Sequence, residues 1–84
     1  MYTHLGNGKM VNFKDVICVL DMDVVTQAKT TVNFLNTAEE EGFTEDVGNG
    51  LPKAVIVTET INGQSKVFFT NIAAQTIKKR VDTN

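Results

Sequence analysis

The sequence predicts a small α+β domain with a mainly antiparallel sheet, one long helix and a short C-terminal helix. Two observations predict this fold class. Three Asn-Gly pairs, at positions 7–8, 49–50 and 62–63, separate short apolar or alternating runs, and Asn-Gly suits the tight turns of β-hairpins because both residues tolerate positive φ. Two other segments carry apolar residues at the 3.6-residue period of a helix. No linker or repeat divides the 84 residues, so 1–84 is expected to form one domain.

The turns define the expected strands. The first Asn-Gly pair joins 2–5 to 9–11, and the third joins 54–59 to 65–70. The middle pair lies between a short alternating run at 43–47 and the strand at 54–59, so it is also a hairpin candidate.

Apolar spacing and caps define the expected helices. The stripe of the long helix is formed by Ala28, Val32, Leu35 and Ala38. Asp23 or Thr26 can serve as its N-cap, and Gly42 is well placed to end it. A shorter helix is expected over 72–81, with Asn71 as its N-cap.

The run 16–20 is apolar at five successive positions, so neither face of this strand is polar. The strand is either central and covered on both sides, or covered by another subunit. Because small chains often gain stability by association, we expect a homo-oligomer. The interface candidates are Val16, Ile17, Val19 and Leu20. Cys18, the single cysteine, excludes an internal disulfide and is expected to be a buried structural residue with a raised pKa.

Charge and composition limit the kinds of partner that the protein can bind. The net charge is −2 and the sequence pI is about 5.2, so any surface for nucleic acid must be a local basic patch. The first residues lack a basic region followed by an apolar run, so no secretory signal is visible. No stretch approaches the ~20 apolar residues of a membrane span. We therefore expect a cytoplasmic protein without a membrane partner.

Few residues point to catalysis. His4 is the only histidine and has no evident triad partner, and Asp21 and Asp23 are expected to be turn and cap residues. The acidic run 39–41 is compatible with a solvated helix face or with a basic subunit partner. The glycine-rich stretch 48–50 precedes a strand, whereas a phosphate-binding loop opens a helix. We expect no enzyme activity, cofactor, metal or small-molecule substrate.

The only basic run, 78–80, has two interpretations. Cations in the last turn of a helix complement the helix dipole, or they extend a phosphate-contacting patch. The DNA-contact candidates are Lys14, Lys53, Lys78, Lys79 and Arg80.

Five motifs in order, spread over nearly the whole chain, resemble bacterial extracellular matrix regulators of the RemA and RemB type, and are closer to the RemB branch. They are MYTHLG at 1–6, KDVI at 14–17, TAEEEG at 37–42, LPKAVIV at 51–57 and TIKKR at 76–80. The resemblance implies a LytTR-like fold and a transcriptional regulator associated with biofilm-matrix genes. It also implies a DNA-binding protein that forms ring-shaped oligomers.

The resemblance further implies where DNA would be contacted. In the RemA branch, contact depends on an arginine before the central strand and on paired arginines before a later strand. Here the first position is Asp15, with Lys14 beside it, and the paired positions fall at about Gly50 and Leu51, followed by Lys53. Lysine is a point charge that cannot reproduce the guanidinium fork. Two functions stay open: an oligomeric regulator with weak, salt-dependent DNA backbone contact, or an oligomeric scaffold that has lost DNA binding.

Overall fold

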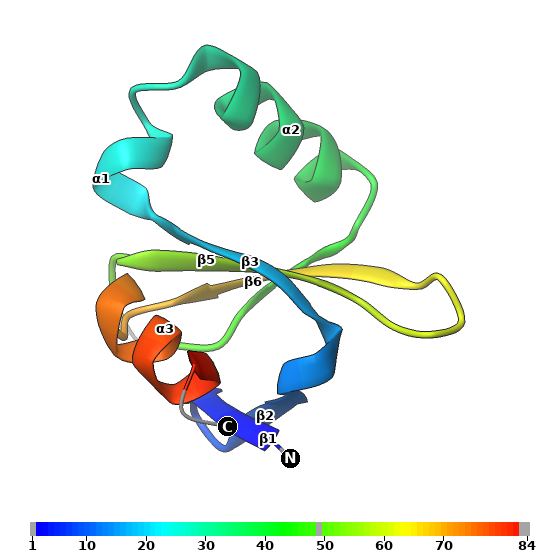
Figure 1. Ribbon diagram of the computed structural model, residues 1–84. Coiled ribbons are helices and arrows are strands. Elements are labelled where there is room, and N and C mark those ends of the chain that lie inside the picture. The colour runs from blue at the N-terminus through cyan, green and yellow to red at the C-terminus, as the bar shows by residue number, and fades with distance from the viewer. Residues whose placement is uncertain (1, 49, 83–84) are drawn as a thin grey trace.

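The computed structural model describes residues 2–48 and 50–82 and has a mixed α+β architecture with two sheets and three α-helices (Figure 1). In chain order the elements are β1 (Tyr2–Gly6), β2 (Lys9–Asn12), the 3₁₀ turn η1 (Phe13–Asp15), β3 (Val16–Asp21), α1 (Met22–Val25), α2 (Lys29–Glu40), β4 (Thr44–Asp46), β5 (Ala54–Glu59), β6 (Ser65–Thr70) and α3 (Ala74–Asp82). Helices α1 and α2 lie on one side of the larger sheet, and α3 and the β1–β2 hairpin lie on the other (Figure 1).

The two outer Asn-Gly pairs form the predicted hairpins. β1 pairs antiparallel with β2 as a separate two-stranded sheet, and β5 pairs antiparallel with β6. Asn7 and Gly8 have φ values of 50° and 74°, as a type I′ turn requires. These hairpins could be predicted because their turns are encoded by adjacent residues.

The middle Asn-Gly pair does not join a hairpin, so that expectation is wrong. β5 already has β3 and β6 as neighbours in the order β3-β5-β6-β4, which leaves no edge of β5 for β4. β4 instead pairs in parallel with β6, with Thr44 opposite Val67. Asn49 itself lies outside the described residues.

The helices differ from the prediction mainly at their beginnings. Helix α2 ends before Gly42, which has a φ of 79°, as expected of a residue just past a helix end. Its N-cap is Ala28, so both predicted N-caps are wrong. The reason is the separate turn α1, which is capped by the Asp21 side chain accepting from the Asp23 N–H, while the Thr26 hydroxyl donates to the Asp23 carbonyl.

The predicted C-terminal helix is confirmed as α3, although it begins at Ala74 rather than at position 72. The chain before it is still turning away from β6, because the Ile72 N–H donates to the Thr70 hydroxyl at 3.1 Å. Asn71 is therefore not the residue that precedes the helix.

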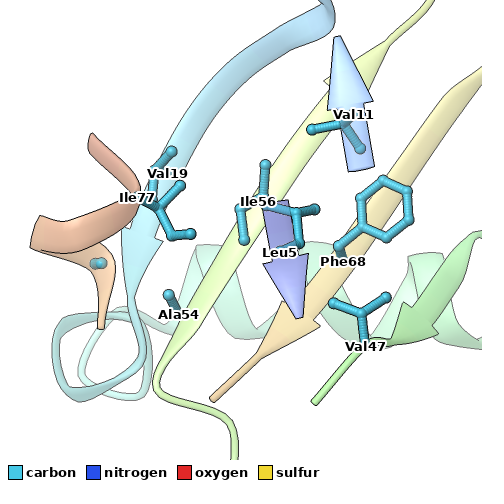
Figure 2. Close-up of a cluster of buried hydrophobic side chains, with 9 residues drawn as sticks. Leu5, Val11, Val19, Val47, Ala54, Ile56, Phe68 and Ile77 are labelled. Atoms are coloured by element: carbon cyan, nitrogen blue, oxygen red, sulfur yellow. The ribbon is translucent and has the colours of Figure 1, made fainter. Parts of the chain in front are cut away.

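Two hydrophobic clusters cover the two faces of the larger sheet. The first, beneath α3 and the β1–β2 hairpin, consists of Leu5, Val11, Val19, Val47, Ala54, Ile56, Phe68, Ala74 and Ile77 (Figure 2). The second, beneath α1 and α2, consists of Val25, Leu35, Ala38, Val55 and Val67. Val55 and Ile56 are adjacent on β5, belong to opposite clusters and are both completely buried. The interior strand β5 thus joins the two halves of the core.

The expectation that the run 16–20 is a central strand is wrong. β3 is an edge strand whose only neighbouring strand in the described chain is β5. Both of its faces are partly covered, since Val19 belongs to the first cluster and Leu20 packs against the second. The pairing with β5 shifts register between Val16 and Cys18, and the intervening Ile17 is 61% exposed. Coverage by another subunit stays a prediction.

Candidate interaction surfaces

The outer edge of β3 is the first candidate surface. Of the four predicted interface residues, Val19 is buried, Val16 and Leu20 are half-buried, and Ile17 is exposed. No other strand in the described chain covers this edge, and an uncovered edge presents backbone N–H and C=O groups that can pair with another strand. β3 contains neither lysine nor proline, residues that block such pairing in many proteins. Its sequence therefore suits contact with another polypeptide.

Cys18 lies on the same strand and is half-buried rather than fully buried as expected. The reason is the position of β3, which has a neighbouring strand on one side only. Burial nevertheless raises the pKa of the Cys18 thiol, in agreement with the sequence prediction. The thiol is therefore a weaker nucleophile at neutral pH than an ordinary exposed cysteine, because less of it is thiolate.

Lys14 and Lys53 are both exposed but lie far apart. Lys14 precedes the start of β3, whereas Lys53 directly precedes Ala54, which pairs with Asp21 at the end of β3. Each strand is six residues long, so the two lysines are separated by roughly 17 Å or more along the strands. A single chain does not bring these two DNA-contact candidates into one patch.

The basic run on α3 has a part in the fold. The side chains of Lys78, Lys79 and Arg80 are exposed in the second half of the helix. The Arg80 Nη1 donates to the His4 carbonyl oxygen at 3.0 Å, so this guanidinium ties α3 to β1. The His4 side chain itself is exposed. The position of the run near the helix C-terminus also fits the dipole interpretation.

A hollow of about 790 Å³ is a surface that the sequence analysis missed. It lies on the face of the larger sheet that carries the β1–β2 hairpin, and its larger apolar lining residues are Tyr2, Met10, Phe43 and Phe68. Tyr2, Met10 and Phe43 are exposed, whereas Phe68 is buried. These residues come from four separate elements or loops, so no spacing pattern in the sequence indicated that they gather.

The charges at this hollow are arranged around one carboxylate. The Nζ atoms of Lys66 and Lys9 lie 3.3 Å and 3.8 Å from the two carboxylate oxygens of Glu45. The Lys9 Nζ also lies 5.4 Å from the centre of the Phe68 ring, within cation–π distance. Two ammonium groups therefore share one carboxylate at the β6–β4 side of the hollow, while Asp15 contributes to its lining near η1.

The described residues also lack two kinds of feature. Across 2–48 and 50–82, no three His, Cys, Asp or Glu residues gather closely enough to hold a metal ion. No helix in that same part of the chain is long and apolar enough to cross a bilayer.

The family model described as RemA-like, extracellular matrix regulatory protein A-like, matches residues 3–81. The chain belongs to this family, whose description assigns it to extracellular matrix regulation at a general level. The match does not distinguish the RemB branch. No curated protein matches the sequence.

Proposed function

We propose that the chain is a non-enzymatic, cytoplasmic regulator of biofilm-matrix genes, formed by one domain over 1–84, that acts as a homo-oligomer and contacts the DNA backbone weakly. Membership of the RemA-like family supports the regulatory role. The finer assignments, to the RemB branch and to a LytTR-like fold, rest on the sequence resemblance and are part of the proposal.

The observation that carries the oligomer is the uncovered edge of β3. On this edge strand Ile17 is 61% exposed, between half-buried Val16 and Cys18. Pairing with another subunit would satisfy the outer backbone groups and remove Ile17 from water. The same contact would explain why the strand is apolar at five successive positions even though it lies at an edge.

Replacing Ile17 with lysine is expected to shift the oligomer toward monomer. The variant loses the apolar area of Ile17 and would bury an ammonium group at the contact, so the dissociation constant should rise at least about tenfold. Light scattering over a micromolar concentration series measures this shift. Val24→Lys is the matched control, since Val24 is 65% exposed and lies on α1, outside β3. A wild-type protein that is monomeric at every concentration would contradict the proposal.

Oligomerisation also bears on DNA contact. Lys14 and Lys53 lie at opposite ends of the β3–β5 pair, so lysines of different subunits must combine to form a patch. Lysines neutralise phosphates without the bidentate guanine contacts that arginine makes. In a chain with net charge −2, measurable affinity requires several subunits to bind at once. A closed ring, as the family resemblance implies, would present such a repeated array.

Removing the charges of Lys14 and Lys53 together should weaken binding to all DNA sequences by similar factors. Each phosphate contact that is lost should reduce the slope of log affinity against log salt concentration by about 0.9. Fluorescence anisotropy with two unrelated duplexes, at low and moderate salt, measures both effects. Lys29→Ala serves as a control because Lys29 is an exposed lysine at the start of α2, outside the set of DNA-contact candidates. An unchanged affinity in the double variant would move the contact to the α3 basic run.

The alternative function is an oligomeric scaffold or protein-interaction module that has lost DNA binding. It is favoured by Asp15, Gly50 and Leu51, which stand where the resemblance implies arginines. Absence of any duplex shift at low salt, with the oligomer intact, would select this alternative.

A further inference from the structure

Ile61 occupies an unusual position for a large apolar residue. It lies at the tip of the β5–β6 hairpin and is 99% exposed. The tip is an ordered turn, because the Thr60 N–H donates to the Gln64 carbonyl at 2.9 Å and the Gly63 N–H donates to the Thr60 carbonyl at 2.9 Å. The hairpin extends beyond the rest of the molecule (Figure 1). The fold therefore presents one isoleucine on a projecting, hydrogen-bonded turn.

The hollow next to this hairpin is lined by large apolar side chains, which suit contact with an exposed isoleucine. Tyr2, Met10 and Phe43 are exposed around it, and buried Phe68 contributes to its lining. Its volume of about 790 Å³ is ample for one isoleucine and the turn that carries it. Ile61 does not fill the hollow of its own chain: it is 99% exposed and does not line the hollow, although Thr60 and Gly63 on either side of it do.

We propose that the hollow receives the β5–β6 hairpin tip of a second copy, with Ile61 against Tyr2, Met10 and Phe43. The inference deepens the proposed homo-oligomer and rests on it. It adds a second contact, made by residues other than those of the β3 edge.

Charge favours this occupant. Lys9 and Lys66 share the single carboxylate of Glu45 at one side of the hollow. Glu59 is exposed at the end of β5, two positions before Ile61, and is the one charged residue between 59 and 64. Entry of the tip on the lysine side would bring this carboxylate to the ammonium pair and away from Asp15.

Thr60 and Gly63 of the tip also line the hollow, so tip and hollow belong to one patch, and two copies can exchange their tips about a two-fold axis. One hairpin tip covers far less than the roughly 800 Å² per partner of a stable interface. The tip contact therefore acts together with the β3 edge, and its removal should weaken the assembly without altering the fold of the subunit.

The first test is Ile61→Lys, compared with Leu51→Lys. Leu51 is 88% exposed in the loop before β5 and does not line the hollow, so it controls for the loss of an exposed apolar residue. Burial of one isoleucine changes an association constant by about tenfold or more. We expect sedimentation velocity to show a dissociation constant at least about tenfold higher for Ile61→Lys, and an unchanged one for Leu51→Lys. Circular dichroism should show the same fold for both variants.

The second test is disulfide formation between copies. A Met10→Cys protein is mixed with an Ile61→Cys protein under mild oxidation, and mass spectrometry identifies the linked peptides, so Cys18 can stay in place. A linkage between positions 10 and 61, in clear excess over that obtained with Leu51→Cys, supports the contact.

The outcomes separate this inference from the proposed function. A wild-type oligomer that is unaffected by Ile61→Lys and gives no excess linkage would overturn the hairpin contact and leave the oligomer standing. A wild-type protein that is monomeric throughout would overturn both.

Discussion

Replacing Phe68 with alanine is expected to lower the free energy of unfolding by about 3–5 kcal/mol. Phe68 lies on the interior strand β6, is 4% exposed and belongs to the cluster beneath the β1–β2 hairpin. Removing its ring leaves a cavity and also removes the surface over which the Lys9 ammonium lies. Domains of this kind have a total stability of about 5–15 kcal/mol, so the variant should be close to its unfolding threshold. Urea denaturation followed by circular dichroism measures the loss.

Phe43→Ala is the matched control, because the same atoms are removed from a residue that is 45% exposed. Its expected cost is about 1 kcal/mol or less, since little apolar area is lost from the core. Both variants should be compared with wild type at one protein concentration, because association adds to apparent stability. Equal losses for the two variants would show that the cluster around Phe68 does not dominate stability.

The sequence was sufficient for those features that neighbouring residues encode. The β1–β2 and β5–β6 hairpins follow from their Asn-Gly turns, and the end of α2 follows from Gly42. The pairing of β4 with β6 is different, because it joins segments separated by an entire strand and no local signal specifies it. The separate turn α1 was also missed, since its cap at Asp21 is equally consistent with the start of one longer helix.

The run 16–20 shows why apolar pattern does not specify strand order. An alternating or continuous apolar pattern reports whether the two faces of a strand are covered, whereas position in the sheet depends on whether its edges are paired. In β3 the faces are partly covered by the two clusters, and one edge is left without a partner in the described chain. The apolar run therefore indicated that the faces of β3 are covered, but it carried no information on whether both edges of the strand are paired.

The candidate surfaces also show which features the sequence indicates and which depend on the folded structure. Motifs along the chain were enough to indicate the family, which the match over 3–81 confirms. The distance between Lys14 and Lys53 depends on the antiparallel pairing of β3 with β5, and the hollow depends on how several segments, distant in the sequence, pack together. Both are properties of the tertiary structure, and no spacing of residues along the sequence indicates either of them.

Gly6→Ala is expected to lower the free energy of unfolding by at least about 2 kcal/mol, for two reasons. Gly6 has a φ of 118°, a conformation that L side chains rarely adopt. A Cβ at this position would also lie 2.5 Å from the Val47 carbonyl oxygen. That carbonyl cannot easily move, because the Val47 side chain is buried and the Val47 N–H donates to the Phe69 carbonyl at 2.9 Å.

The β1–β2 hairpin cannot readily shift away from this contact either. The Thr70 hydroxyl donates to the carbonyl of Leu5 next to Gly6, and the Leu5 side chain is completely buried. Gly8→Ala is the control, since Gly8 also has a positive φ, of 74°, but a Cβ there would point into open space, with no heavy atom beyond its chain neighbours within 4 Å. The Gly8→Ala variant should therefore lose only the stability that the positive-φ backbone conformation costs an alanine. Thermal unfolding of both variants measures the difference, with about 4–8 °C expected per kcal/mol in a domain of this size. If Gly8→Ala lowered the melting temperature as much as Gly6→Ala, crowding against Val47 would contribute nothing to how the hairpin is held on the sheet.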